Sequence, residues 1–244
     1  MPTLPFPIRT TPPEAVTFDA TGTLFHSPRL GEIYAEILGR HGLAVEADVA
    51  RRLVREVWQE LSCLATPERD RFTAHEGGAR GWWLRFVERF AERLEAPPPS
   101  RFAAAELFAR FARPDAWEVY PEVPEALEAL GHRGFRLAVI SNWDERLPAV
   151  LEGLDLARHF TAIVTSGDVG VEKPDRRIFD HALSLLGVPS ARAIHVGDRE
   201  VEDCEGALAA GFSGAIRVDR GRGGRSRGAL RDLTGVLARV PPGR

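Results

Sequence analysis

The chain has 244 residues, a net charge of -3 at pH 7 and only two cysteines. So small a charge gives no reason to expect a nucleic-acid or membrane-surface partner, and no apolar run approaches the roughly 20 residues of a membrane span. Because the N-terminus also lacks a basic segment followed by an apolar core, we expect a cytoplasmic protein, either a monomer or a homodimer.

A short apolar run at residues 15–18 leads directly to Asp19 and predicts a buried strand. Between residues 27 and 114 the pattern changes, because apolar residues recur at helical spacing with charges between them. Prolines at 97–99 separate the last two of four predicted helices, and Ser100 is suited to cap the last one. The pattern therefore predicts an all-helical domain of residues 27–114, inserted after the first strand.

Beyond this block, strands and helices alternate along the chain. The predicted segments are helix 121–131, strand 135–140, helix 144–154, strand 162–165, helix 175–186, strand 193–196, helix 201–210, strand 215–218 and helix 228–237. Such alternation predicts an α/β core, residues 1–26 and 115–244, with a parallel sheet covered on both faces. Residues 221–228, rich in glycine and arginine, are predicted to be a solvated loop, with a phosphate-binding loop as the alternative.

Polar residues follow four of the predicted strands or their loops. They are Asp19, Thr21 and Thr23, then Ser141 and Asn142, then Lys173, and finally Asp198 and Asp203. Taken singly, these are ordinary helix caps, surface residues or turn residues. Because the carboxyl ends of parallel strands meet at one edge of a sheet, however, we expect the whole set to lie close together and to form a ligand site.

A carboxylate nucleophile is the hypothesis that explains this set. If Asp19 attacks a phosphorus centre, the negative charge of the substrate must be offset. Mg²⁺ prefers oxygen ligands, and Asp19, Asp198 and the backbone carbonyl of Thr21 are the candidates, with Asp203 orienting a metal-bound water. The sequence thus predicts a magnesium site and covalent catalysis through an aspartyl-phosphate.

The phosphoryl group of such a substrate needs hydrogen-bond donors and a fixed positive charge. Lys173 is predicted to supply the charge, and Ser141 together with turn N–H groups is predicted to bind the phosphoryl oxygens. Thr23 and Asn142 are further candidates for substrate binding. Within the helical domain, Arg80 is the candidate for substrate contact, whereas the neighbouring pair Trp82–Trp83 is more typical of packing.

The ordered set Asp19-x-Thr21-Gly22-Thr23, Ser141-Asn142, Lys173-Pro174 and Gly197-Asp198 with Asp203 resembles the motifs of the haloacid dehalogenase superfamily of hydrolases. The resemblance spans residues 15 to 218. It implies a Rossmann-like three-layer core with a C1-type helical cap, and a Mg²⁺-dependent hydrolase of a small phosphorylated substrate. On this resemblance Asp19 is the nucleophile, Ser141 and Lys173 are phosphate ligands and Asp198 is a metal ligand.

Thr21 departs from the pattern of that superfamily, whose phosphatases usually carry a second aspartate there as general acid and base. Losing such a group costs about 100- to 10,000-fold in rate, although a metal-binding role of the Thr21 carbonyl is unaffected. Three hypotheses therefore stay open: a phosphatase that is slow or uses an activated substrate, a haloacid dehalogenase, and a catalytically silent phosphate-binding or regulatory protein.

Overall fold

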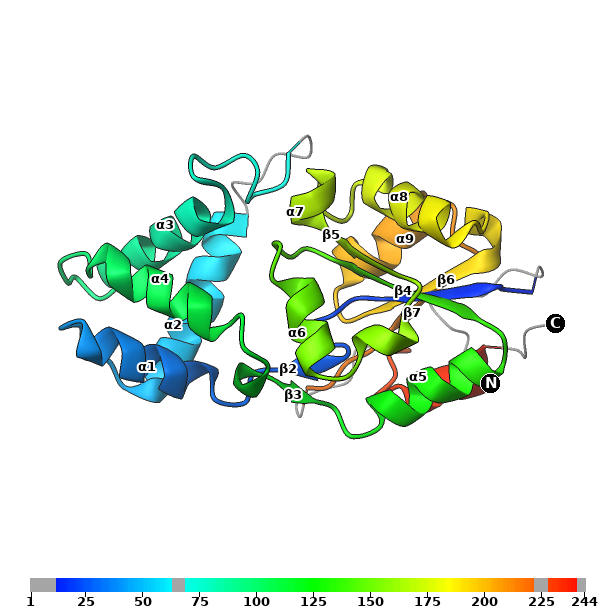
Figure 1. Cartoon of the computed structure of the whole chain (residues 1–244), viewed down its shortest axis with the longest axis horizontal. Helices are drawn as coiled ribbons and strands as arrows, with labels where there is room; N and C mark the ends of the chain where they lie inside the picture. The colour runs from blue at the N-terminus through cyan, green and yellow to red at the C-terminus, as the bar shows by residue number, and fades with distance from the viewer. Residues whose placement is uncertain (1–11, 63–68, 222–227, 241–244) are drawn as a thin grey trace.

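The computed structural model describes residues 12–62, 69–221 and 228–240 (Figure 1). Its central sheet has five parallel strands, β1 (Ala15–Phe18), β4 (Arg136–Ser141), β5 (Ala162–Thr165), β6 (Ala193–Gly197) and β7 (Gly214–Arg217). Their order is β5-β4-β1-β6-β7, so the strand that ends at Asp19 lies in the centre of the sheet. The predicted α/β fold is confirmed.

Helices cover both faces of this sheet, as parallel strands require. Helices α5 (Val123–His132), α6 (Leu147–Gly153) and α10 (Thr234–Arg239) pack on the face that Val16 and Phe18 of β1 present. Helices α8 (Arg176–Leu186) and α9 (Gly206–Ala209) pack on the opposite face, together with Ala15. The alternating side chains of one central strand therefore contribute to two separate hydrophobic layers.

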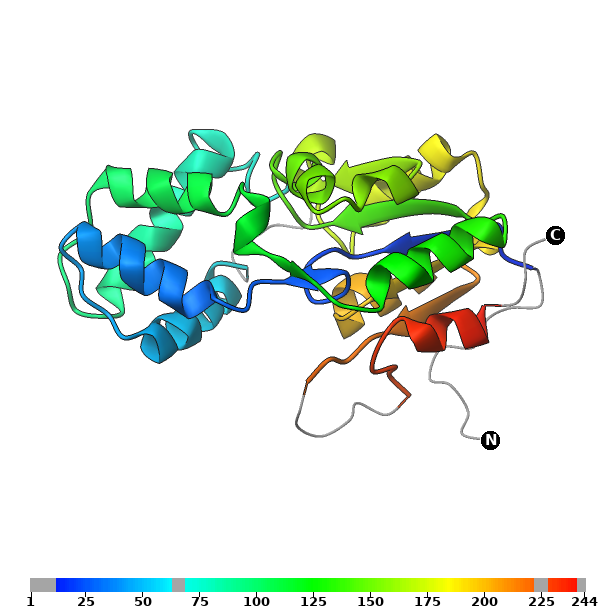
Figure 2. The same ribbon diagram turned by 60° about the horizontal axis from the view of Figure 1, so that its bottom comes forward.

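Four further helices form a helical unit beyond one edge of the sheet (Figures 1 and 2). They are α1 (Leu30–Arg40), α2 (Ala47–Ser62), α3 (Gly78–Glu92) and α4 (Arg101–Arg110). The helical unit has its own hydrophobic cluster, in which Tyr34, Phe86 and Phe90 are buried. Ser100 caps α4 as predicted, because its hydroxyl accepts a hydrogen bond from the backbone N–H of Phe102.

The two connections to the helical unit pair with each other as a short antiparallel ribbon, which the sequence did not predict. Strands β2 (Phe25–His26) and β3 (Glu118–Val119) have two residues each. Such segments are too short to show the alternation by which strands are recognised. The ribbon lies close to the nucleophile candidate, since β2 follows Asp19 by only a few residues.

Three predicted helices differ in the structure. The segment 201–210 is a π-helical turn, Glu200–Glu205, followed by α9. Helix α6 begins at Leu147, because the side chain of Asp144 pairs with Arg146 just before it. Helix α10 is shorter than the predicted 228–237, and a short helix α7 (Ser166–Val169) was not predicted.

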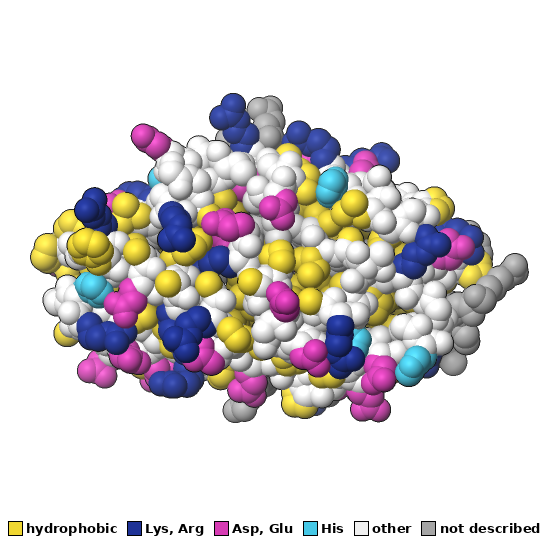
Figure 3. All heavy atoms as spheres, viewed as in Figure 1, with side chains coloured by type: hydrophobic (Ala, Val, Ile, Leu, Met, Phe, Trp, Pro, Cys, Tyr) yellow, Lys and Arg dark blue, Asp and Glu magenta, His cyan; other side chains and the backbone are white. Residues whose placement is uncertain are grey.

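Acidic and basic side chains are interspersed over the face drawn in Figure 3, in line with the small net charge. Among the described residues, no helix combines the length and apolar character needed to cross a bilayer. Most of the glycine- and arginine-rich segment, residues 222–227, lies outside the described part of the chain, so its predicted loop is not tested.

Candidate active site

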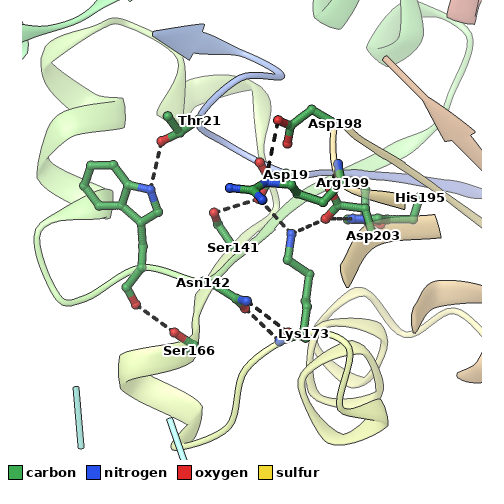
Figure 4. A network of polar contacts seen from close by, with 12 residues as sticks. Asp19, Thr21, Ser141, Asn142, Ser166, Lys173, His195, Asp198, Arg199 and Asp203 are labelled. Carbon is green, nitrogen blue, oxygen red and sulfur yellow. Dashed lines mark hydrogen bonds and ion pairs between the residues drawn. The ribbon is translucent and has the colours of Figure 1, made fainter. Parts of the chain in front are cut away.

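Most of the predicted site residues meet at the carboxyl edge of the sheet, whereas Arg80 of the helical unit does not (Figure 4). Asp19 follows β1, and its Oδ1 accepts a hydrogen bond of 2.9 Å from the hydroxyl of Ser141 at the end of β4. The ammonium of Lys173, from the loop before α8, donates to the same oxygen at 2.7 Å. Burial is the largest influence on Asp19 and raises the pKa of its carboxyl above the ordinary value.

Lys173 is the central charge of this arrangement. Its side chain is almost completely buried, and its Nζ contacts Asp203 Oδ1 at 2.5 Å in addition to Asp19. Burial alone would lower the pKa of this ammonium, but the charges of Asp19 and Asp203 outweigh burial and raise the pKa above its usual range. Lys173 is therefore a permanently charged group at neutral pH.

Asn142 holds the backbone of Lys173 in place. Its Oδ1 accepts a hydrogen bond of 2.7 Å from the Lys173 N–H, and its Nδ2 donates to the Lys173 carbonyl at 3.0 Å. Because both ends of the amide are used in this way, the structure places Asn142 against the lysine loop, whereas the sequence suggested a substrate-binding role.

Asp203 is fixed by a hydrogen-bond chain that runs back into the sheet. The backbone N–H of Arg199 donates to Asp203 Oδ2 at 2.8 Å, and His195 Nε2 lies 3.3 Å from Asp203 Oδ1. The hydroxyl of Thr17 lies 2.7 Å from His195 Nδ1 and can donate to it, which leaves the imidazole proton on Nε2, facing Asp203. Burial favours protonation of Asp203, but Lys173 and the histidine outweigh it and hold the pKa of this carboxyl below its usual range.

The sequence did not single out Thr17 and His195. Both side chains are fully buried, and burial lowers the pKa of His195, so the imidazole is neutral at pH 7. The available signal was their occurrence as polar residues inside the otherwise apolar strands β1 and β6. Buried polar groups are almost always hydrogen-bonded, and here the bonds lead to the site.

Three carboxylates form a cluster that can hold a cation. One oxygen each of Asp19, Asp198 and Asp203 lies within 4.8 Å of the others. Burial, followed by repulsion from the other two carboxylates, raises the pKa of Asp198 to about 7. Gly22 allows Asp198 to lie close to the loop that follows Asp19. A Cβ atom on residue 22 would be only 2.8 Å from Asp198 Oδ2, and the φ of Gly22 is +88°, which glycine adopts readily.

The loop after Asp19 uses most of its backbone donors internally. The N–H groups of Gly22, Thr23, Leu24 and Phe25 all bond to carbonyls of the same loop. Within the described part of the chain, the N–H groups of Ala20 and Thr21 have no such partner. The hydroxyl of Thr23 is buried and makes no hydrogen bond to any described residue. Two backbone donors and one hydroxyl are thus left available next to the nucleophile candidate.

A buried ion pair joins the helical unit to the loop that carries Lys173. The guanidinium of Arg71 contacts both carboxylate oxygens of Glu172 at 2.7 and 2.5 Å, and the two side chains are only 7% and 11% exposed. The cation also lies 4.7 Å from the ring of Trp58. The sequence did not predict this contact, because nothing local links residues so distant along the chain.

A second polar contact joins the helical unit to the segment after β4. The indole N–H of Trp83 donates to Asp144 at 2.8 Å, and Asp144 is paired with Arg146 at 2.6 Å. Arg146 donates in turn to the carbonyl of Phe108 in α4 at 2.9 Å. Trp83 therefore joins the two parts of the molecule, while Trp82 is buried within the helical unit as the packing interpretation predicted.

Arg80 lies at the rim of the same interface. Its exposed guanidinium is 4.6 Å from the ring of Phe108. It lines a pocket of about 290 Å³ with Phe72, Thr73, Gly77, Gly78, Ala79, Glu145 and Gly167. Because Glu145 and Gly167 belong to the sheet core, this pocket opens between the helical unit and the core.

Comparison with known proteins agrees with the motifs. The sequence model of the haloacid dehalogenase-like hydrolases matches residues 13–211. Haloacid dehalogenase-like hydrolase domain-containing protein 3 of Homo sapiens is 35% identical over 206 residues, which cover 83% of this chain and 81% of the human protein. A phosphoserine phosphatase of Thermus thermophilus is 39% identical over 146 residues, 57% of each chain.

A likeness in the solved structures concerns the fold. An L-2-haloacid dehalogenase superposes with a TM-score of 0.74 and 21% identity, over 94% of this chain and 99% of that one. The solved dehalogenase therefore has the same fold as this chain, with a central parallel sheet and inserted helices. The match over most of the sequence confirms the resemblance that the four motifs indicated, and the chain belongs to the haloacid dehalogenase-like hydrolase family.

Proposed function

We propose that the protein is a Mg²⁺-dependent phosphatase that acts through an aspartyl-phosphate on a small phosphorylated metabolite. The observation that carries this proposal is the shared contact of Lys173 and Ser141 with one oxygen of Asp19. This contact leaves the other carboxylate oxygen to act as a nucleophile. A relative named as a phosphoserine phosphatase supports the same reaction class.

The residues present fit a divalent cation. Three carboxylates lie together, and burial followed by repulsion from Asp19 and Asp203 raises the pKa of Asp198 to about 7. We assign Asp19, Asp198 and the carbonyl of Thr21 as ligands. Both oxygens of Asp203 are already hydrogen-bonded, so Asp203 acts indirectly, through a metal-bound water. When bound, Mg²⁺ supplies positive charge that offsets the charge of the phosphoryl group.

The protein's own groups then hold the phosphoryl oxygens. Lys173 and Ser141, which both contact Asp19, are the side-chain donors, and the N–H groups of Ala20 and Thr21, which bond to no described residue, are the backbone donors. Such fixed donors stabilise charge that develops during transfer more than they stabilise the bound substrate. Thr23, whose hydroxyl bonds to none of the residues that the structure describes, is the remaining candidate donor.

The helical unit is the part that selects the substrate. We propose that residues 27–114 act as a cap domain over a core of residues 1–26 and 115–244. Arg80 lines a pocket between the two parts, and we propose it as the residue that contacts the group attached to the phosphate. The acidic cluster disfavours the dehalogenase alternative, because displacement of halide from carbon by Asp19 needs no cation.

The test is release of phosphate from a chromogenic aryl phosphate by the full chain, with Mg²⁺ and with EDTA. We expect turnover that EDTA abolishes and added Mg²⁺ restores, together with an acid-stable, base-labile phosphoprotein that Asp19→Asn does not form. Unchanged phosphate release in EDTA, or no release from aryl, acyl and alkyl phosphates alike, would contradict the proposal.

A further inference from the structure

Two residues after the nucleophile candidate, the chain carries a hydroxyl side chain, Thr21, that cannot titrate near neutral pH. Thr21 is exposed, and its Oγ1 accepts a hydrogen bond of 2.9 Å from the indole N–H of Trp143 (Figure 4). An indole N–H is a donor only. It therefore occupies an acceptor position of the Thr21 oxygen, and the hydroxyl can offer its proton in a hydrogen bond but does not give it up.

Trp143 holds this hydroxyl firmly. Its ring packs edge-on against Phe25 at 6.2 Å between centroids and lies 5.3 Å from the ring of Trp117. Phe25 belongs to the ribbon that leads from the nucleophile loop to the helical unit. The orientation of Thr21 is thus set by packed aromatic rings, and Trp143 is a positioning residue that acts through Thr21.

None of the described side chains bonded to Asp19 or Thr21 can protonate a departing oxygen. Apart from Trp143 they are Ser141 and Lys173. The ammonium of Lys173 is held between two carboxylates, at 2.7 Å from Asp19 and 2.5 Å from Asp203, so its protons are engaged in ion pairs. The nearby His195 is also engaged, because both of its ring nitrogens bond within the protein.

Asp198 is not a general acid in this arrangement either, since the proposed function makes it an ionised metal ligand. An unprotonated leaving oxygen must then depart as an anion. An alkoxide is about as basic as hydroxide, whose conjugate acid has a pKa of about 15.7. That value lies about 12 units above the pKa of a carboxylic acid such as an aspartate side chain, about 3.9.

Resting on the proposed function, we propose that the substrate is a phosphoryl donor whose leaving oxygen departs as a stable anion, above all an acyl phosphate, and not the phosphate ester of a simple alcohol. Transfer from an acyl phosphate to Asp19 exchanges one carboxylate for another. Neither the attacking carboxylate nor the leaving carboxylate needs a proton in that step, so the absence of an acid at residue 21 lowers the rate little. The protein's own geometry thus favours this class.

The reaction balances without a further reactant. An oxygen of Asp19 forms a bond to phosphorus while the bond between phosphorus and the leaving oxygen breaks, and the electron pair departs with a carboxylate. Water then attacks the phosphorus of the aspartyl-phosphate, and the bond to the Asp19 oxygen breaks. Both hydrogens of the water leave on the inorganic phosphate, and the Asp19 carboxylate is restored.

The experiment compares kcat/KM across leaving groups of different acidity, with Mg²⁺ present. The series is acetyl phosphate, several substituted phenyl phosphates and phosphoserine as the alkyl ester. The variants are Thr21→Asp, which adds a carboxylic acid, and Thr21→Asn, whose side chain has the shape of aspartate but cannot act as an acid. For the unsubstituted chain we expect a steep dependence, with acetyl phosphate at least about 100-fold faster than phosphoserine, the lower end of what a general acid supplies.

Thr21→Asp should make kcat/KM depend less on the acidity of the leaving group, because it raises turnover of phosphoserine about 100-fold or more. Thr21→Asn should leave the dependence steep. Turnover of phosphoserine by the unsubstituted chain as fast as turnover of acetyl phosphate would overturn the inference and leave the phosphatase proposal standing. No turnover of any compound by any variant would instead overturn the phosphatase proposal, and the inference with it.

The role of Trp143 has its own readout. Trp143→Phe keeps an aromatic ring for packing but removes the N–H. Combined with Thr21→Asp, it should move the alkaline limb of the pH profile of kcat/KM for phosphoserine to higher pH, because the introduced carboxyl must be protonated to act and loses a donor that stabilises its ionised form. A pH profile that is the same with and without Trp143→Phe would show that Trp143 only packs and does not position residue 21.

Discussion

The carboxyl edge of the sheet and the interface with the helical unit both contain buried ion pairs, but they balance charge differently. At the sheet edge, three carboxylates face two cations: Lys173 contacts Asp19 and Asp203, and Arg199 lies 4.0 Å from Asp198, so negative charge is in excess. At the interface, Arg71 meets Glu172 and the charges cancel. An unbalanced cluster is suited to bind a charged ligand, whereas a balanced pair is suited to hold two surfaces together.

The two regions also differ in what holds their side chains in place. At the sheet edge, Asp19, Ser141 and Asp198 lie at or just after strand ends, and the loop residue Lys173 is braced by Asn142, which bonds to its backbone. The interface depends on a few long side chains that reach across it, such as Arg71 and Trp83. We infer that the sheet edge stays assembled whether or not the helical unit is in contact, and the predictions below test that difference.

The largest expected effect comes from changing the charges at the sheet edge. Asp19→Asn and Lys173→Met should each lower kcat by at least about 1,000-fold, because one removes the nucleophile and the other its charged partner. Their effects on stability should be opposite. Lys173→Met leaves the carboxylates unpaired and should lower the free energy of unfolding by about 3–5 kcal/mol at pH 7, while Asp19→Asn removes one excess charge and should not lower it.

The measurements are phosphate release and urea denaturation of the two variants under the same conditions. The loss in Lys173→Met should shrink as the pH falls toward 5. Without the lysine the carboxylates take up protons more easily in the folded than in the unfolded chain, so lower pH stabilises the folded form. Equal destabilisation by both substitutions would show that the cluster is not in charge excess.

A smaller effect is expected when the ion pair at the interface is broken. Arg71→Met keeps the apolar stem against Trp58 but leaves Glu172 unpaired, so the contact weakens and the helical unit separates more easily. We expect KM to rise about tenfold, which corresponds to about 1.4 kcal/mol, while kcat stays within about threefold. Hydrogen exchange should become faster around residues 70–74, which lie at this contact.

Arg89→Met is the matched control, because among the described residues Arg89 pairs with two glutamates of the helical unit, Glu60 and Glu92, and with none of the core. It should leave both kinetic constants nearly unchanged. A fall in kcat by Arg71→Met as large as that of Lys173→Met would contradict the distinction between the two regions, since it would mean that the interface is needed to assemble the sheet edge.

The same difference explains what sequence reasoning could find. Asp19, Ser141, Lys173 and Asp198 were expected together because a parallel sheet brings strand ends to one edge, and strand 162–165 was predicted with the bounds it has. Pairs such as Arg71 and Glu172 left no local pattern, since their meeting depends on how the helical unit docks.

The sequence did not predict the atomic contacts inside the site either. The π-helical turn at Glu200–Glu205 brings Asp203 so close to Gly197 that a Cβ atom on Gly197 would lie 2.2 Å from its carboxylate. No periodicity reports such an approach. For the same reason the sequence did not predict that the amide of Asn142, a candidate for substrate binding, bonds to the backbone of Lys173. Strand order can be predicted from alternation, but side-chain direction follows from packing.

The smallest expected effect concerns the pH dependence of Mg²⁺ binding, which tests the sheet edge without changing any of its residues. The raised pKa of Asp198, about 7, means that a proton competes with the metal below that pH. Its carboxylate is mostly ionised at pH 8 and mostly protonated at pH 6. The affinity for Mg²⁺, measured by calorimetry without substrate, should therefore be about tenfold weaker at pH 6 than at pH 8. Arg71→Met should show the same tenfold change if the sheet edge binds metal independently of the helical unit, and an affinity that does not vary with pH would mean that Asp198 is not a ligand.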